Sequence, residues 1–113
     1  IKSQRLQEKA SSVGFDWSDI AEVWVKLYEE IDELKIACES GDLNAIEDEI
    51  GDCFFSLINL SRHLKISAEN SIRKSNEKFL RRFKKMEVEI SKMGKKIDNI
   101  SLLEFSKIWE GVK

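Results

Sequence analysis

Apolar residues recur every three or four positions along most of the chain, which is the spacing of one face of an α-helix. Five segments show this period, and none alternates between apolar and polar residues as a strand would. Proline is absent and only five glycines occur, so little interrupts long helices. The pattern predicts an all-α helical bundle of about five helices. The expected apolar faces are Leu6, Ala10 and Val13; Ile20, Trp24, Leu27, Ile31, Leu34 and Cys38; Ile46, Ile50, Cys53, Leu57, Leu60 and Leu64; Ile72, Phe79, Phe83, Met86 and Ile90; and Phe105, Ile108, Trp109 and Val112.

Capping residues and glycines indicate where these helices begin and end. Small polar residues favour a helix start, an acidic residue three positions later strengthens that signal, and glycine favours a stop. The second to fourth helices are expected over about residues 19–39, 44–64 and 67–93. The expected helix stops are Gly14 and Gly41. The expected helix starts are Asp16 or Ser18 for the second helix, Asn44 with Glu47 for the third, Ser67 for the fourth, and Ser101 with Glu104 for the fifth.

Carboxylates stand beside the apolar faces of the second and third helices. At about 100° per residue, Glu49 and Asp52 share one polar stripe of the third helix. Glu30 and Glu33 share a narrow stripe of the second helix with Lys26. If the two helices pack by their apolar faces, the four carboxylates converge. The stripe of the third helix continues through Ser56, Asn59 and His63.

Four converging carboxylates repel one another unless a cation neutralises them. Oxygen-only ligands suit Mg²⁺ or Mn²⁺, which keep bound waters and often bridge to substrate phosphates. A ferritin-like di-iron site is excluded, because it needs Glu-x-x-His on two helices and Leu60 stands three residues before His63, the only histidine. A simpler alternative is that the acidic residues stabilise a helix start and that Lys26 and Glu30 form an ordinary surface pair.

Composition narrows the classes of function. The formal net charge of −2 gives no overall basic footprint for nucleic acid. No run approaches the roughly 18 apolar residues of a membrane span. Cys38 and Cys53 lie on apolar faces without metal-ligand spacing, which favours buried reduced thiols and a cytoplasmic location over a disulfide. The chain starts at Ile1 without a methionine, so residues 1–113 are interpreted as one domain that can be cut from a longer protein.

Four stretches carry a resemblance to a known family. The stretches GFDW (14–17), KLYEEIDEL (26–34), EIGDCFFSLINLSRHL (49–64) and KSNEKFLRRF (74–83) resemble MazG-type nucleoside triphosphate pyrophosphohydrolases. They follow the order of the family's E-E-x-x-E and E-x-x-D motifs. The ending from Leu102 to Lys113, with Trp109, is similar to the close of the second domain of two-domain MazG proteins.

The resemblance implies an all-α enzyme that dimerises to complete its bundle. Such enzymes use Mg²⁺ to hydrolyse a nucleoside triphosphate between its α- and β-phosphates, giving a nucleoside monophosphate and pyrophosphate. The metal ligands carried over are Glu30, Glu33, Glu49 and Asp52. The other implied site residues are Lys26 and Glu29 beside the metal, Lys78 and Arg82 for the phosphates, and Trp109 for the nucleotide.

The residues themselves are compatible with these roles. Lys78 and Arg82 are one turn apart, so a phosphate chain can lie across both, although a solvated basic face is the alternative. Trp109 can equally be a core residue beside Phe105 and Val112. Glu29 or Glu30 is the expected acceptor of a proton from water, and Asn59 is a further candidate for contact with the base or ribose.

Two other classes of function compete with the enzyme. One is a helical bundle that binds metal without catalysis, and the other is a helical module that binds a protein partner. Retention of the four carboxylates together with Lys78 and Arg82 favours the enzyme. The base that the site prefers does not follow from the sequence.

Overall fold

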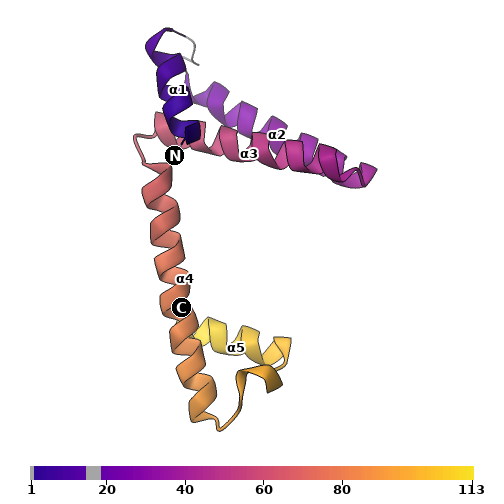
Figure 1. The fold of residues 1–113 in the computed structure, drawn as a ribbon, viewed down its shortest axis with the longest axis vertical. Coiled ribbons are helices and arrows are strands. Elements are labelled where there is room, and N and C mark those ends of the chain that lie inside the picture. The colour runs from indigo at the N-terminus through magenta and orange to yellow at the C-terminus, as the bar shows by residue number, and fades with distance from the viewer. Residues whose placement is uncertain (1, 15–18) are drawn as a thin grey trace. The chain divides into compact units, whose positions relative to one another are not determined.

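A computed structural model describes residues 2–14 and 19–113, and these residues form helices and no strand. The predicted all-α fold is confirmed. No helix in the described ranges has the length and apolar character to cross a membrane. The elements are α1 (Lys2–Ser12), α2 (Ile20–Ser40), α3 (Leu43–His63), α4 (Ala68–Lys92), the short 3₁₀ helix η1 (Ile97–Asn99) and α5 (Leu102–Val112) (Figure 1).

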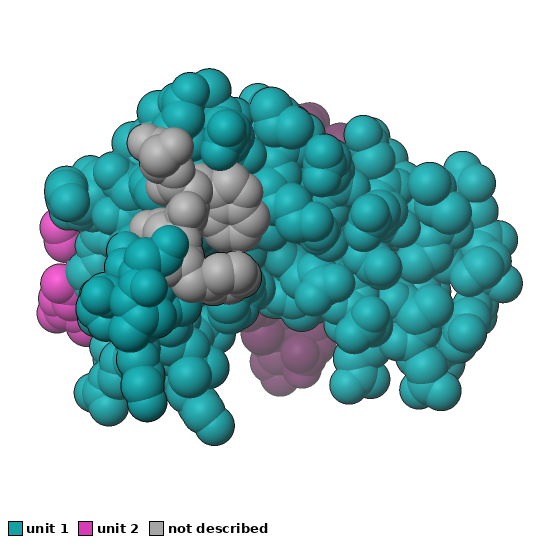
Figure 2. Space-filling view, turned by 90° about the horizontal axis from the view of Figure 1, so that it is seen from above, with its two compact units in different colours: residues 1–69 teal, residues 70–113 magenta. Residues whose placement is uncertain are grey.

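The chain divides into two compact units. Unit 1 comprises residues 1–69 and unit 2 comprises residues 70–113, shown in different colours in Figure 2. Helices α1 to α3 belong to unit 1, whereas nearly all of α4, together with α5, belongs to unit 2. Each unit is described by itself below.

Unit 1 is built on a helical hairpin of α2 and α3. Gly41 ends α2 with a left-handed backbone (φ 72°), and its N–H donates to the Cys38 carbonyl. The Asp42 carboxylate then accepts from the backbone N–H groups of Asn44 and Ala45 and caps α3. This short turn brings α2 alongside α3, where Val23, Leu27 and Leu60 form a buried cluster.

Two predicted caps need correction. Helix α3 begins at Leu43 after the Asp42 cap, so the predicted Asn44–Glu47 capping box is wrong. Asp19 caps α2 by accepting from the Ala21 N–H, whereas the predicted caps Asp16 and Ser18 lie outside the described residues. Asp42 lies two residues before the predicted Asn44, and Asp19 lies one residue after Ser18 and three after Asp16.

The buried face of α2 also differs from the predicted one. Helix α2 buries Val23, Leu27, Glu30 and Ala37, whereas Trp24, Ile31 and Cys38 of the predicted face remain exposed. The helix carries apolar residues on two adjoining faces, and the face that includes Glu30 is the one that turns toward α3. Neither cysteine forms a disulfide, and Cys53 is half-buried.

Helix α1 packs on α3 through a residue that the apolar pattern did not indicate. Gln7 is buried and its Nε2 donates to the Phe55 carbonyl at 2.9 Å. The predicted apolar residues Leu6 and Val13 are exposed. A glutamine takes the buried position because its amide can reach a backbone carbonyl of the neighbouring helix, which no aliphatic side chain can do.

Unit 2 consists of α4, η1 and α5, with the apolar residues Met86, Ile90 and Ile100 buried between them. Phe83, Phe105, Ile108, Trp109 and Val112 pack against this cluster. Ser101 caps α5 by accepting from the Glu104 N–H, as the sequence predicted. Ile72 and Phe79, which were expected on the buried stripe of α4, are exposed.

Candidate functional site

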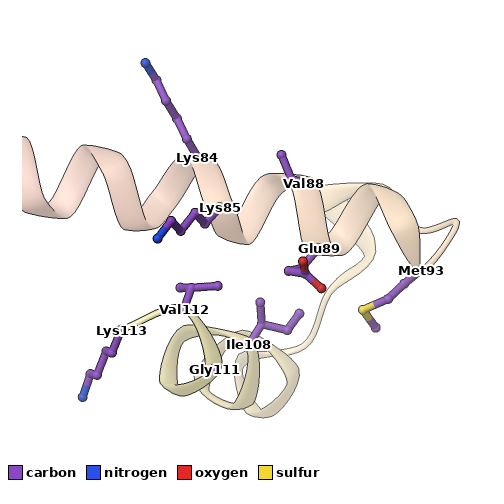
Figure 3. A pocket seen from close by; sticks show the side chains of 9 residues that line it. All are labelled: Lys84, Lys85, Val88, Glu89, Met93, Ile108, Gly111, Val112 and Lys113. Carbon is purple, nitrogen blue, oxygen red and sulfur yellow. The ribbon is translucent and has the colours of Figure 1, made fainter.

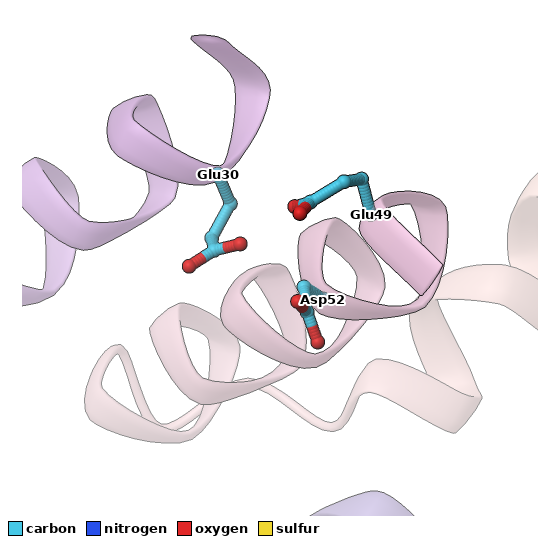
Figure 4. Close-up of side chains that lie close together, drawn as sticks. All are labelled: Glu30, Glu49 and Asp52. Atoms are coloured by element: carbon cyan, nitrogen blue, oxygen red, sulfur yellow. The ribbon is translucent and has the colours of Figure 1, made fainter. Parts of the chain in front are cut away.

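Three of the four predicted metal ligands meet between α2 and α3. Glu30 of α2 and Glu49 and Asp52 of α3 each offer one oxygen, and these oxygens all lie within 4.8 Å of one another (Figure 4). The two residues of α3 are three positions apart, so they share a face of the helix. Glu30 approaches from the buried face of α2. We call Glu30, Glu49 and Asp52 the carboxylate cluster.

The carboxylate cluster is partly removed from solvent. Glu30 is only 4% exposed. Its Oε1 lies 2.7 Å from the Lys26 ammonium, one turn earlier on α2. Its Oε2 and the Oε2 of Glu49 are buried and have no hydrogen-bond partner among the described residues. Buried carboxylate oxygens without partners are costly, so the cluster fits a bound cation.

The charges in the cluster act on one another. Burial raises the pKa of the Glu49 carboxyl, and the negative charges of Glu33, Asp52, Glu30 and Asp48 raise it further. Burial likewise raises the pKa of Asp52, as do the charges of Asp48 and Glu30, while Lys26 opposes this rise. Both carboxyls are therefore less acidic than usual, because burial and the neighbouring negative charges both disfavour their ionised forms.

Stabilisation of a helix start does not account for these acidic residues. Because α3 begins at Leu43, its first turn contains no acidic residue. Glu49 and Asp52 lie in later turns, where the helix dipole has little effect. Lys26 and Glu30 do form an i, i+4 ion pair, but the Glu30 side chain is nearly fully buried, so this is not an ordinary surface pair.

The other predicted residues of α2 lie at the edge of the carboxylate cluster. Glu33 is exposed and is not one of the three converging residues, although its charge raises the pKa of Glu49. Glu29 is exposed, with Oε2 at 3.9 Å from the Lys26 ammonium. The hydrogen bond to Glu30 chiefly raises the pKa of Lys26, so the ammonium stays charged at neutral pH.

A cavity of about 300 Å³ opens beside the carboxylate cluster, between α2 and α3. Two of its lining residues belong to the cluster, whereas Val23, Phe55 and Ser56 were not predicted as site residues. Ser56 could have been recognised from its place in the polar stripe of α3. The lining residues are Val23, Lys26, Glu30, Asp52, Phe55, Ser56 and Asn59.

Asn59 is fixed by a neighbour on α3. It is 4% exposed, and its Oδ1 accepts a hydrogen bond from Arg62 Nη2 at 2.7 Å. The same nitrogen lies 3.2 Å from His63 Nε2. Arg62 was not predicted as a site residue; the only signal for it in the sequence is the i, i+3 spacing of a long donor after an asparagine.

The remaining predicted residues belong to unit 2. Lys78 is exposed and Arg82 is half-buried, and both lie on α4 one turn apart. Trp109 of α5 packs against the core of unit 2, and its ring centroid lies 5.3 Å from that of Phe79. The core role considered for Trp109 is therefore present in the structure, and a contact with nucleotide stays a prediction.

Unit 2 has its own hollow of about 670 Å³ between α4 and α5 (Figure 3). Its polar residues are chiefly lysines, and Glu89 is its only carboxylate. None of the predicted site residues lines it. The hollow lacks the converging acidic groups that distinguish the carboxylate cluster, so the cluster is the better candidate site.

The donor set of the cluster suits a hard divalent cation. Its three residues supply only carboxylate oxygens, which Mg²⁺ and Mn²⁺ prefer. Burial raises the pKa of the Cys53 thiol, and the nearby charges of Glu30, Glu49 and Asp52 raise it further. The thiol therefore stays protonated and is a poor ligand or nucleophile.

The chain is similar to a known domain family and to named proteins. The chain matches the MazG nucleotide pyrophosphohydrolase domain over residues 19–87, which include the whole carboxylate cluster. It is 43% identical over 111 residues to a Thermotoga maritima protein named nucleoside triphosphate pyrophosphohydrolase/pyrophosphatase MazG, covering 98% of this chain and 42% of that protein. It is 36% identical over 115 residues to the nucleoside triphosphate pyrophosphohydrolase of Escherichia coli K12, covering 100% of this chain and 44% of that protein.

A more distant relative matches a shorter part. The Bacillus subtilis protein YabN, described as uncharacterized, is 35% identical over 68 residues, covering 60% of this chain and 14% of that protein. The chain spans less than half the length of these relatives. The domain match extends over more than half of the chain, and its residues include the three converging carboxylates. The chain therefore belongs to the MazG nucleotide pyrophosphohydrolase domain family.

Proposed function

We propose that the domain hydrolyses nucleoside triphosphates between the α- and β-phosphates, releasing a nucleoside monophosphate and pyrophosphate. The single observation that carries this proposal is the carboxylate cluster, whose buried oxygens on Glu30 and Glu49 have no partner in the described part of the chain. The names of the Thermotoga maritima and Escherichia coli relatives support the same reaction.

Glu30, Glu49 and Asp52 would hold the metal, and Glu33 is the fourth proposed ligand. Mg²⁺ is the proposed ion and Mn²⁺ a substitute, since both favour oxygen ligands. When bound, the ion supplies Lewis-acid polarisation of phosphate oxygens and neutralises their charge. A bound cation would reduce the electrostatic repulsion among the ligand carboxylates, and this favours the metal-bound state.

Residues of α2 surround the proposed reaction centre. Lys26 provides a cationic partner for one oxygen of Glu30. Glu29 is exposed and lies outside the three converging residues, so its carboxylate is available to accept a proton from the attacking water. Glu30 was the other candidate base, but its oxygens are already committed to Lys26 and the cluster.

Lys78 and Arg82 are the proposed phosphate-binding residues. Their i, i+4 spacing on α4 presents two cations along one line, and arginine can donate two parallel hydrogen bonds to a phosphate. Trp109, which is half-buried, is proposed to contact the nucleotide. The family resemblance of residues 74–83 and of the chain's ending supports these assignments.

One assay tests the reaction directly. The protein is incubated with each nucleoside triphosphate and Mg²⁺, and pyrophosphate and orthophosphate are measured separately. Pyrophosphate release in equal amounts with nucleoside monophosphate is expected. Release of orthophosphate alone would contradict cleavage between the α- and β-phosphates. Binding of Mg²⁺ without hydrolysis of any triphosphate would instead support a metal-binding bundle without catalysis.

The proposal includes a homodimer. Helix α3 exposes Ile50, Phe54 and Leu57 at the i, i+4, i+7 spacing, with Phe54 62% exposed, and α2 exposes Trp24, Tyr28 and Ile31 in the same way. Monomeric proteins seldom expose such continuous apolar stripes. Light scattering at micromolar concentration should return twice the chain mass of 13.1 kDa, and Phe54→Asp should lower that mass. A monomeric wild type would contradict the dimer.

A cytoplasmic location completes the proposal. Cys38 and Cys53 are both free thiols, which fits a reducing compartment.

A further inference from the structure

The side-chain amide of Asn59 has a defined orientation. A guanidinium can only donate hydrogen bonds, so the amide atom that faces Arg62 Nη2 at 2.7 Å is the oxygen. The amide nitrogen therefore lies on the other side, and no described residue accepts a hydrogen bond from it. Because Asn59 lines the cavity between α2 and α3, the cavity receives a hydrogen-bond donor from this residue.

The arginine that sets this orientation is itself held in place. Arg62 Nη2 lies between Asn59 Oδ1 and His63 Nε2, at 2.7 Å and 3.2 Å. One nitrogen with two N–H groups can donate to both acceptors, which requires His63 to carry its proton on Nδ1. The three residues form one short network at the end of α3.

The position of Asn59 relative to the carboxylate cluster suits a nucleoside. Asn59 follows Asp52 by seven residues, which places it two turns along the same face and about 10 Å further along the helix axis. Phe55 and Val23 provide apolar walls between these two points. A nucleotide with its phosphates at the cluster would thus place its flat ring against the walls and its ring edge at Asn59.

We propose that Asn59 donates a hydrogen bond to a keto oxygen of the nucleobase, and that Arg62 is the positioning residue that keeps the donor turned toward the base. This inference rests on the proposed function. Uracil and hypoxanthine present a keto oxygen where cytosine and adenine present an amino group. An amino group would bring a donor against the Asn59 donor and leave both without partners. The site therefore favours UTP over CTP and ITP over ATP.

The test compares nucleotide pairs that differ at this ring edge. For the wild type, kcat/KM should be about tenfold or more higher for UTP than for CTP, the effect of one unmade buried hydrogen bond. Asn59→Asp keeps the contact with Arg62 but replaces the donor by an acceptor, so the order should reverse. Arg62→Met removes the group that orients the amide, and the ratio should fall toward one.

A matched control separates these effects from a general change of charge. Asn70 and Arg73 on α4 form the same i, i+3 contact at 3.3 Å on an exposed surface. Asn70→Asp should leave the ratio of UTP to CTP unchanged. Circular dichroism checks that every variant keeps its helicity, and Arg62→Met tests the proposal if Asn59→Asp does not fold.

Binding of α,β-methylene analogues of UTP and CTP with Mg²⁺ distinguishes the inference from the proposed function. A preference for the UTP analogue without hydrolysis of any triphosphate would overturn the reaction but support the role of Asn59. Hydrolysis of both nucleotides at equal kcat/KM, or an unchanged ratio in Asn59→Asp, would support the reaction and overturn the role of Asn59.

Discussion

The Lys26 ammonium lies 2.7 Å from Oε1 of Glu30, while Oε2 of the same carboxylate is buried without a partner in the described part of the chain. One oxygen is thus neutralised by the protein and the other is left for a cation. The two residues are one turn apart on α2, so the helix itself sets this arrangement. The ion pair thus gives a cationic partner to a carboxylate that burial separates from water.

Lys26→Met should destabilise the metal-free protein. The change keeps most of the apolar stem but leaves Glu30 buried without its cation, and a charged hydrogen bond of this kind contributes about 1 kcal/mol or more when its donor is partly exposed. Urea denaturation in the presence of a chelator measures the loss. Lys92→Met is the control, because Lys92 pairs with Glu89 on an exposed surface and no measurable change is expected. Equal effects of the two substitutions would show that Glu30 does not depend on Lys26.

Glu49→Gln should leave metal-free stability unchanged or raise it, because repulsion within the carboxylate cluster falls at nearly constant shape. The same variant should lose hydrolysis and most of its stabilisation by Mg²⁺. The wild type should gain about 2.7 kcal/mol at a Mg²⁺ concentration of 100 times Kd. Thermal melts with and without Mg²⁺ measure both effects.

Glu47→Gln is the matched control for this substitution. Glu47 is an exposed carboxylate of the same helix and is not one of the three converging residues. Its variant should keep the full response to Mg²⁺. A wild type that gains nothing from Mg²⁺ or Mn²⁺, with nucleotide present, would contradict the metal site.

The contribution of Glu49 and Asp52 to metal-free stability should fall as the pH rises through the carboxyl range. The pKa values of Glu49 and Asp52 are raised above their ordinary values of 4.5 and 3.8. The folded state therefore binds protons more tightly than the unfolded state, so this contribution to stability is present below the ordinary values and is lost as the pH rises through the raised ones. Urea midpoints from about pH 4 to about pH 8 measure the trend.

A variant with both charges removed isolates this contribution to the pH dependence. Glu49→Gln combined with Asp52→Asn should gain stability relative to the wild type as the pH increases. If the difference between the two proteins stays constant with pH, the two carboxyls do not titrate as the structure indicates.

Lys78→Ala and Arg82→Ala should each lower kcat/KM about tenfold or more, because each removes a charge-assisted contact with phosphate. Mg²⁺ binding and helicity should be retained, since neither residue is in the carboxylate cluster. Lys84→Ala, an exposed lysine of the same helix, should have little effect on kcat/KM. Unchanged kinetics in both variants would indicate that Lys78 and Arg82 belong to a solvated basic face and do not bind phosphate.

The sequence predicted the helices better than their buried faces. Gly41 and Ser101 appear where a stop and a cap were expected, because these signals depend only on local backbone chemistry. The spacing of the carboxylates also placed Glu49 and Asp52 on one face correctly. The burial of Glu30 and Gln7 was missed, because it depends on which helices meet and not on the period of either one.

The same limit explains why Asn59 could be named but its orientation could not. Periodicity placed Asn59 on the polar stripe of α3, whereas the contact with Arg62 fixes which end of the amide turns toward the guanidinium. The exposure of Trp24 and Ile31 has a related cause. Helix α2 carries two adjoining apolar faces, and each fits the helical spacing of apolar residues. Only the packing against α3 decides which of the two faces is buried.

The hairpin of α2 and α3 has a consequence for folding kinetics. All three residues of the carboxylate cluster lie within one pair of helices joined at Gly41 and Asp42. Contacts that are close in sequence form early, because little chain entropy is lost in closing a short loop. The carboxylates therefore come together when this hairpin closes. A divalent cation that binds the closed hairpin would stabilise the hairpin relative to the unfolded chain.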